Sequence, residues 1–286
     1  MTPTSTALHL PGAIVGTTAG PLSHDIDARW LMAYAAALGE EDPRYYDTAT
    51  AAGPLAHPLF PVCYEWPLAV ELRARAISEV VAALGVHATH QLTIHRLPRR
   101  GDRLSTAARI VSVNRRRAGA LVIVRFDTTD ARGEPVSTTL HGSLYRGVET
   151  DAAAGTRVDD GGRASDGPIR WEAPVPVAAK AAHLYTECAR IWNPIHTDGA
   201  VARAAGLPGP ILHGTATLAL GVSRVVARDL GGEPARVRGV SARFTGMVPV
   251  PSRFVVRGRA GGTSAIEFDA VDAGGRPVLS DGTLTL

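Results

Sequence analysis

The densest group of chemically capable residues lies between positions 193 and 214. The run Asn193-Pro194-Ile195-His196-Thr197-Asp198 is followed, after a stretch rich in alanine, by Pro210-Ile211-Leu212-His213-Gly214. Pro194 cannot continue a helix and predicts a tight turn, which would project Asn193 and His196 away from regular backbone. An imidazole in such a turn can move protons near neutral pH. The segment therefore predicts a proton-transfer site.

The pair His213-Gly214 precedes a long apolar stretch that reads as a helix over about residues 214–230. A glycine at a helix start lets a ligand approach the backbone N–H groups, and the helix dipole adds positive potential there. Thr197-Asp198 is typical of a helix cap, which places His196 beside a second helix start. The two stretches together predict a proton-transfer imidazole and an oxyanion-binding helix end.

A segment without a helix or strand pattern divides the chain into two halves of similar length. Residues 147–169 are rich in Gly, Ala and Asp, show no strand or helix period, and are interpreted as a linker. This predicts an N-terminal unit at residues 1–146 and a C-terminal unit at residues 170–286, with the candidate site in the second.

The halves read as diverged copies of one unit. Residues 126–136 (Phe-Asp-Thr-Thr-Asp-Ala-Arg-Gly-Glu-Pro-Val) resemble residues 268–278 (Phe-Asp-Ala-Val-Asp-Ala-Gly-Gly-Arg-Pro-Val), and both predict a β-hairpin. Tyr34 precedes Asp42-Pro43 as Tyr185 precedes Asn193-Pro194. Each copy is expected to hold a polar helix, a proline-containing turn, one long apolar helix and an antiparallel meander, which is an α+β fold.

The expected helices and strands follow that plan in both copies. The helices are predicted at 28–38, 61–84, 178–191 and 214–230, and the strands at 91–97, 103–113, 121–128, 136–145, 238–244, 253–260, 264–270 and 278–286. A single sheet of this kind leaves an open strand edge, so we expect the copies to pair edge to edge with a cleft between them.

Composition excludes several classes of protein. The 30 Lys and Arg residues nearly balance the 27 Asp and Glu residues, which argues against a nucleic-acid-binding surface. Lys180 is the one lysine, so the chain has no P-loop. Cys63 and Cys188 cannot form a disulfide framework or a zinc site. Without a signal peptide pattern or a run of about 20 apolar residues, a cytoplasmic protein is expected, bound to no membrane.

The run from Tyr185 to Gly214 resembles the MaoC-like, R-specific enoyl-CoA hydratase (hydratase 2) family of the hotdog superfamily. The resemblance continues through Arg243-Phe244 and Pro249, and the whole chain looks like the double-hotdog form, with two helix-wrapped units in tandem. It implies reversible hydration of a 2-enoyl thioester of coenzyme A or a carrier protein. It also implies a degenerate first unit that helps bind the acyl chain, and a homodimer.

Single residues carry over from the family. His196 matches the catalytic histidine, Asn193 the asparagine of the same turn, and Gly214 the residue whose N–H polarises the thioester carbonyl. The family's catalytic aspartate stands two places before the asparagine, where this chain has Ile191. An isoleucine can neither accept a proton nor orient water. Slower or altered chemistry is expected unless another carboxyl group replaces the aspartate.

Two glutamates could replace it. Glu187 lies one helical turn before Ile191, and Glu65 lies near the start of the first unit's long helix. Glu40 occupies the position equivalent to Ile191 in the first copy, where Tyr45 replaces His196. His213, Ile191 and Tyr185 are expected to contact substrate.

The leading hypothesis is therefore a lyase, a hydratase or dehydratase of acyl thioesters in fatty acid or polyketide metabolism. Its coenzyme A or phosphopantetheine would be part of the substrate, and no cofactor or metal is expected. An isomerase, cyclase or thioesterase could use the same pocket. The alternative from another class is a non-catalytic protein that binds acyl thioesters, supported by the missing aspartate.

Overall fold

We describe the chain from a computed structural model, which places residues 8–51, 53–151, 153–156, 167–260 and 265–286. The first half contains, in order, β1 (His9–Leu10), η1 (Gly12–Ile14), β2 (Thr18–Asp25), α1 (Ala28–Ala37), η2 (Pro43–Tyr45), α2 (Pro61–Ala76), α3 (Glu79–Ala82), β3 (Gly85–Ile94), β4 (Arg103–Arg116), β5 (Gly119–Thr129), β6 (Pro135–Arg146), β7 (Glu149–Thr150) and β8 (Ala154–Gly155). The second half contains β9 (Ile169–Val177), α4 (Ala181–Ala189), η3 (Pro194–His196), α5 (Gly199–Ala204), α6 (Gly214–Asp229), η4 (Pro234–Arg236), β10 (Gly239–Phe244), β11 (Ser252–Arg259), β12 (Ala265–Asp272) and β13 (Pro277–Thr285).

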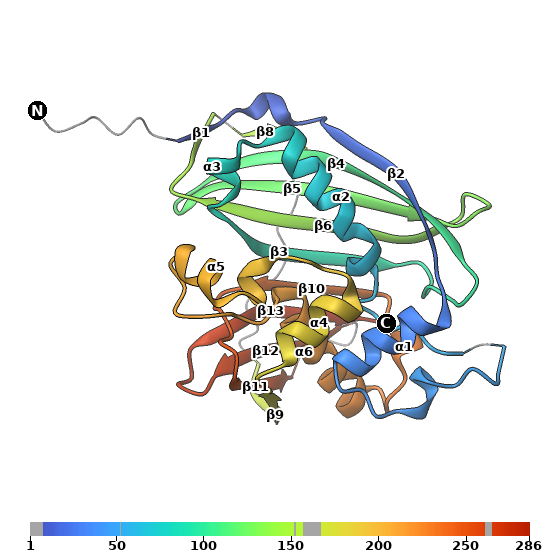
Figure 1. The fold of residues 1–286 in the computed structure, drawn as a ribbon. Helices are drawn as coiled ribbons and strands as arrows, with labels where there is room; N and C mark the ends of the chain where they lie inside the picture. Colours follow the sequence, from blue (N-terminus) through green and yellow to red (C-terminus); the bar gives the residue numbers. More distant parts are fainter. Residues whose placement is uncertain (1–7, 52, 152, 157–166, 261–264) are drawn as a thin grey trace, which may run out of the picture.

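The main sheet repeats one strand order. In the first half the order is β2-β4-β5-β6-β3, and in the second it is β9-β11-β12-β13-β10. The two half-sheets join where β3 pairs antiparallel with β10, with Leu92 opposite Val240. Figure 1 shows the two half-sheets one above the other, with α2 lying across the first. The predicted α+β class and the edge-to-edge pairing of the copies are confirmed.

The predicted repeat is also visible in the turns. Asp130 and Asp272 close the β5–β6 and β12–β13 hairpins, and each carboxylate accepts two backbone N–H groups of its own turn. Tyr34 of α1 and Tyr185 of α4 meet between the halves, with their buried hydroxyl oxygens 3.3 Å apart. The two copies therefore pack as equivalent units.

Each long helix packs on its own half-sheet. Helix α2 contacts β2 and β4, and α6 contacts β11, β12 and β13. Gly221 lets α6 lie close to the sheet, because a Cβ there would stand 3.3 Å from the Phe268 ring. No helix in the described part of the chain is long and apolar enough to cross a membrane.

Several predicted boundaries were wrong. The helix expected at 61–84 ends at Ala76, because Ile77 turns to an extended conformation and buries its side chain in the core of the first half; α3 is separate. The helix expected at 178–191 covers Ala181–Ala189, since Arg190 adopts the left-handed conformation with φ 59°.

Strands β2 and β9 were not predicted. They are the outer strands of the sheet, and their polar, proline-containing sequences suit an edge. The linker predicted at 147–169 shows no period, yet β7 and β8 lie within it, and β9 begins at its end. Residues 152 and 157–166 of the linker lie outside the described residues.

Candidate active site

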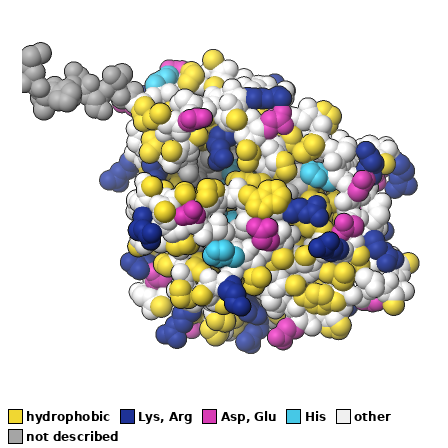
Figure 2. Space-filling view, viewed as in Figure 1, with side chains coloured by type: hydrophobic (Ala, Val, Ile, Leu, Met, Phe, Trp, Pro, Cys, Tyr) yellow, Lys and Arg dark blue, Asp and Glu magenta, His cyan; other side chains and the backbone are white. Residues whose placement is uncertain are grey.

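A cavity of about 230 Å³ lies between the two halves. Its walls come from α2, β3 and β6 of the first half and from η3, α6 and β10 of the second. A hollow is visible on the face drawn in Figure 2, with hydrophobic and Lys or Arg side chains around it. His196, Asn193, Gly214, His213 and Ile191 all line the cavity. These residues, which come from two short stretches of the sequence, therefore line the same cavity.

The turn that holds His196 forms as the sequence predicts. Asn193 caps the short helix η3, its side-chain oxygen accepting the N–H of Ile195 at 3.4 Å, and Pro194 occupies the first helical position. His196 ends this turn, and only 8% of its surface is exposed. Its Nδ1 lies 2.8 Å from the carbonyl oxygen of Ile211, so Nδ1 carries the proton. Nε2 is therefore left with its lone pair, as a base requires.

Burial keeps this imidazole neutral. Loss of solvent lowers the pKa of His196 to about 4, against a smaller opposing effect from the Ile211 carbonyl. The ring of His213 stacks on that of His196 with centroids 3.7 Å apart. Burial, with the neighbouring His196, lowers the pKa of His213 to about 2. His213 Nε2 donates toward the Ile191 carbonyl oxygen at 3.4 Å and lies 3.2 Å from the Thr186 hydroxyl.

The start of α6 faces the same cavity. His213 occupies the cap position without a side-chain hydrogen bond, so the first N–H groups of α6 have no side-chain cap. Gly214 leaves little room for a side chain, because a Cβ there would stand 3.2 Å from the ring of Phe244. Thr215 follows in the lining, and its hydroxyl receives a hydrogen bond of 3.0 Å from Tyr185.

Ile191 occupies a buried position in the lining, with 4% of its surface exposed. The preceding residue, Arg190, packs its guanidinium 4.0 Å from the centre of the Trp30 ring. No carboxyl group enters the cavity at this point, because the side chain there is apolar.

The cavity contains one carboxyl group among the described residues that line it, and this is Glu65. Glu65 lies on α2 with 4% of its surface exposed, and its carboxyl accepts a hydrogen bond of 2.6 Å from Thr139. Burial raises its pKa to about 8, so the group is mostly protonated at neutral pH. The same cavity therefore contains a protonated acid, Glu65, and a neutral base, His196.

Two predicted site residues lie elsewhere. Glu187 is exposed on α4 and does not line the cavity, so the structure gives it no place beside His196. Tyr185 lies behind the wall, where it touches Thr215 and Tyr34.

The first copy holds a counterpart of the same turn. Asp42 caps η2 as Asn193 caps η3, and Tyr45 stands where His196 does. The rings of Tyr45 and His57 stack with centroids 6.3 Å apart, a wider separation than the 3.7 Å between the rings of His196 and His213. His57 also lies near Glu40, with 3.8 Å between Nε2 and the carboxyl oxygen. These residues lie outside the cavity lining.

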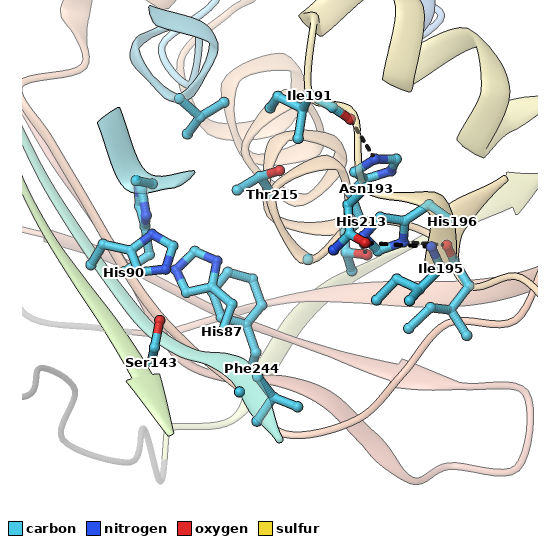
Figure 3. Close-up of a pocket in the computed structure, with 18 of the residues that line it drawn as sticks. His87, His90, Ser143, Ile191, Asn193, Ile195, His196, His213, Thr215 and Phe244 are labelled. Atoms are coloured by element: carbon cyan, nitrogen blue, oxygen red, sulfur yellow. Dashed lines mark hydrogen bonds between the residues drawn. The ribbon is translucent and has the colours of Figure 1, made fainter. Parts of the chain in front are cut away.

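Sequence reasoning missed a histidine cluster in the lining, formed by His87, His90 and His141. A bulge between His87 and Thr89 turns His87 and His90 to the same face of β3, and His141 lies opposite His90 on β6. Figure 3 shows His87 and His90 on one side of the cavity and His196 and His213 on the other, with Thr215 between them. The alternation of a regular strand would place His87 and His90 on opposite faces, so the sequence carries no signal for this cluster.

Comparison with known proteins agrees with this arrangement. Residues 162–274 match the MaoC like domain, and residues 13–139 match the dehydratase domain region described as FAS1-like. The second half of the chain is a MaoC-like domain. The fold of the whole chain is the double hotdog, and the resemblance noted in the sequence is confirmed at the level of the family.

A solved structure of a MaoC-like dehydratase from Phytophthora capsici superposes on this chain with a TM-score of 0.86 at 21% identity, over 95% of each chain. Among curated relatives, the fatty acid synthase subunit beta of Aspergillus oryzae is 46% identical over 76 residues, which are 26% of this chain and 4% of that protein. The enoyl-CoA hydratase ChsH3 of Mycobacterium tuberculosis is 38% identical over 73 residues, 26% of this chain and 25% of that protein. The matched stretches are therefore short parts of both relatives.

Proposed function

We propose that the protein hydrates 2-enoyl thioesters of coenzyme A or a carrier protein, and catalyses the reverse dehydration of 3-hydroxyacyl thioesters. The observation that carries this proposal is the placement of a neutral imidazole, His196, in one cavity with the uncapped start of α6 at Gly214. Curated relatives named enoyl-CoA hydratase, which match short stretches of this chain at 38–40% identity, support it.

The proposed mechanism uses three groups. The Gly214 N–H donates to the thioester carbonyl oxygen, which stabilises the enolate-like charge that develops there. His196 Nε2 takes a proton from water while the water oxygen bonds to Cβ, and the electron pair of the double bond moves toward Cα. Glu65, protonated at neutral pH, then gives its proton to Cα. Glu65 thus replaces the catalytic aspartate of the family, whose position is occupied by Ile191 in this chain. Proton exchange with solvent then returns His196 to its neutral form and Glu65 to its protonated form.

The first test measures hydration of crotonyl-CoA and longer enoyl-CoA esters, followed as loss of the conjugated thioester absorbance. We expect turnover, with His196→Ala lowering kcat by about 10²–10⁴-fold. His183→Ala is the matched control, because His183 is an exposed histidine on α4 outside the cavity lining. Absence of turnover in both directions with wild-type protein, or full turnover by His196→Ala, would contradict the proposal.

A second candidate is a protein that binds acyl thioesters without hydrating them, or that isomerises, cyclises or hydrolyses them. It is favoured by the buried, apolar Ile191 beside the histidine pair. Product analysis over an acyl-CoA panel separates these reactions. Thioester binding that survives in His196→Ala, with no product from wild-type protein, would favour the binding protein.

We also propose that the chain forms a homodimer. Large apolar side chains are exposed near the site turn, including Trp192 at 59% and Leu184 at 51%. Light scattering after gel filtration should give twice the chain mass of 30.0 kDa. Dissociation by Trp192→Glu would locate the interface.

A further inference from the structure

The histidine cluster lies in the same cavity as the proposed reaction centre and takes no part in the proposed mechanism. One ring nitrogen from each of His87, His90 and His141 lies within 4.8 Å of the other two. His90 is buried, with 1% of its surface exposed, and neither of its ring nitrogens has a hydrogen-bond partner in the described part of the chain. A buried imidazole without a partner is costly, and it suggests that a ligand supplies one.

The ring geometry argues against a shared metal ion. His87 and His141 stack nearly parallel, with centroids 3.7 Å apart and 9° between their planes. A metal ion about 2.1 Å from a ring nitrogen lies close to the plane of that ring, where the lone pair points. Two stacked rings cannot both direct a lone pair at one ion, so the cluster fits hydrogen bonding to a polar group better than it fits coordination.

A cation lies beside the cluster. Arg73, from the last turn of α2, lines the cavity and acts electrostatically on both His141 and Tyr145. It forms no ion pair with an acidic residue in the described ranges, whereas Arg75 on the same helix pairs with Glu71. An adjoining small cavity of about 60 Å³ shares Arg73, His141 and Ser143 with the main one. This end of the cavity therefore has one uncompensated positive charge.

Arg73 lies beyond Glu65 along α2, away from the start of the helix. The cavity follows one face of the helix, from Val62 through Glu65 and Ala69 to Arg73. At 1.5 Å per residue, the proposed acid Glu65 and Arg73 are about 12 Å apart along the helix axis. Figure 3 shows the histidines of β3 across the cavity from His196. A thioester held at Gly214 would extend its acyl chain toward this end.

We infer that Arg73, His90 and the neighbouring histidines form a subsite for a carboxylate on the distal end of the acyl chain. The protein would then act on monothioesters of dicarboxylic acids in preference to plain fatty acyl thioesters. An arginine without an acidic partner is complemented by a carboxylate, and an imidazole N–H can add a second hydrogen bond to it. This inference rests on the proposed function for the position of the thioester, but its test does not need turnover.

The test compares the binding of saturated coenzyme A thioesters, which cannot be hydrated. Calorimetry with adipoyl-CoA and hexanoyl-CoA, and with the longer pair suberoyl-CoA and octanoyl-CoA, isolates the distal group at equal chain length. We expect wild-type protein to bind the carboxylate-ended member of at least one pair about tenfold or more tightly. Arg73→Gln should abolish the difference, and His90→Gln should reduce it. Arg75→Gln is the matched control on the same helix and should keep it.

Three results would overturn the inference. The first is equal or weaker binding of both carboxylate-ended thioesters by wild-type protein. The second is an equal loss of affinity for all four ligands in Arg73→Gln, which would place Arg73 at the phosphates of coenzyme A. The third is tight zinc binding by wild-type protein that His90→Gln removes. A retained carboxylate preference without any hydration activity would instead support the subsite and contradict only the proposed function.

Discussion

The imidazole rings of His196 and His213 stack with centroids 3.7 Å apart and 26° between their planes. Each ring is oriented by a backbone carbonyl oxygen, that of Ile211 for His196 and that of Ile191 for His213. The peptide group of Ile191 thus supports the histidine pair, although its side chain cannot replace an acid. The stack fixes the plane of His196, so Nε2 keeps one direction in the cavity.

The first prediction concerns pH. The proposed base, His196, has a pKa near 4 and must be neutral, so activity should fall as the pH drops through about 4. The proposed acid, Glu65, has a pKa near 8 and must be protonated, so activity should fall as the pH rises through about 8. A profile of kcat/KM against pH should therefore be bell-shaped. Glu65→Gln should lower the plateau and remove the alkaline limb, whereas Glu71→Gln, on the same helix outside the cavity, should change neither. An alkaline limb that persists in Glu65→Gln would exclude Glu65 as the acid.

The second prediction tests the start of α6. In Gly214→Ala the new Cβ would press on the Phe244 ring at 3.2 Å and displace either the ring or the helix end. Because one misplaced oxyanion donor costs up to about 10²–10³ in kcat, we expect a fall of at least tenfold with little change in Tm. Phe244→Leu in the same protein should restore part of the loss.

Gly221→Ala supplies the control for crowding in α6. Its Cβ would meet the Phe268 ring at 3.3 Å, in the same helix but outside the cavity lining. We expect kcat to be unchanged in this variant. Equal losses of kcat in Gly214→Ala and Gly221→Ala would mean that the helix as a whole, rather than its first N–H groups, sets the activity.

The third prediction restores the acid that the family places two residues before Asn193. Ile191→Asp puts a carboxyl group into the lining beside His213 and His196. We expect turnover to rise by about tenfold or more, since a positioned acid or base contributes about 10²–10⁴-fold. Ile191→Asn is the matched control, with the same shape and no titrating group. An asparagine variant as active as the aspartate variant would show that the gain comes from shape alone.

The sequence predicts the backbone of the candidate site where that backbone depends on neighbouring residues. Asn193, His196, His213 and Gly214 lie within one stretch of chain, and Pro194 and the helix start determine how they project. The hairpins closed by Asp130 and Asp272 are equally local, because each aspartate caps its own turn. These turns and helix starts depend on residues that are adjacent in the chain, so a single sequence is enough to predict them.

Features that depend on pairing between distant strands were not predictable. The histidine cluster needs a bulge in β3 and the register of β6, neither of which leaves a pattern in the sequence. The edge strand β9 contains Pro174 and Pro176 and lacks an apolar run. The place of Glu65 depends on how α2 lies over the cavity, so sequence comparison could suggest this residue only by analogy.

The last prediction concerns the backbone beside the site. Arg190 ends α4 in the left-handed conformation, with φ 59°, which costs a residue other than glycine about 1–2 kcal/mol. Arg190→Gly and Arg190→Ala both remove the guanidinium from the Trp30 ring, so they differ mainly in this strain and in chain entropy. We expect Arg190→Gly to be more stable than Arg190→Ala by about 1 kcal/mol in urea unfolding. Equal stability of Arg190→Ala and Arg190→Gly would mean that residue 190 is not in the left-handed conformation and that α4 ends differently. The hydrogen bond between the Ile191 carbonyl and His213 could then no longer be assigned.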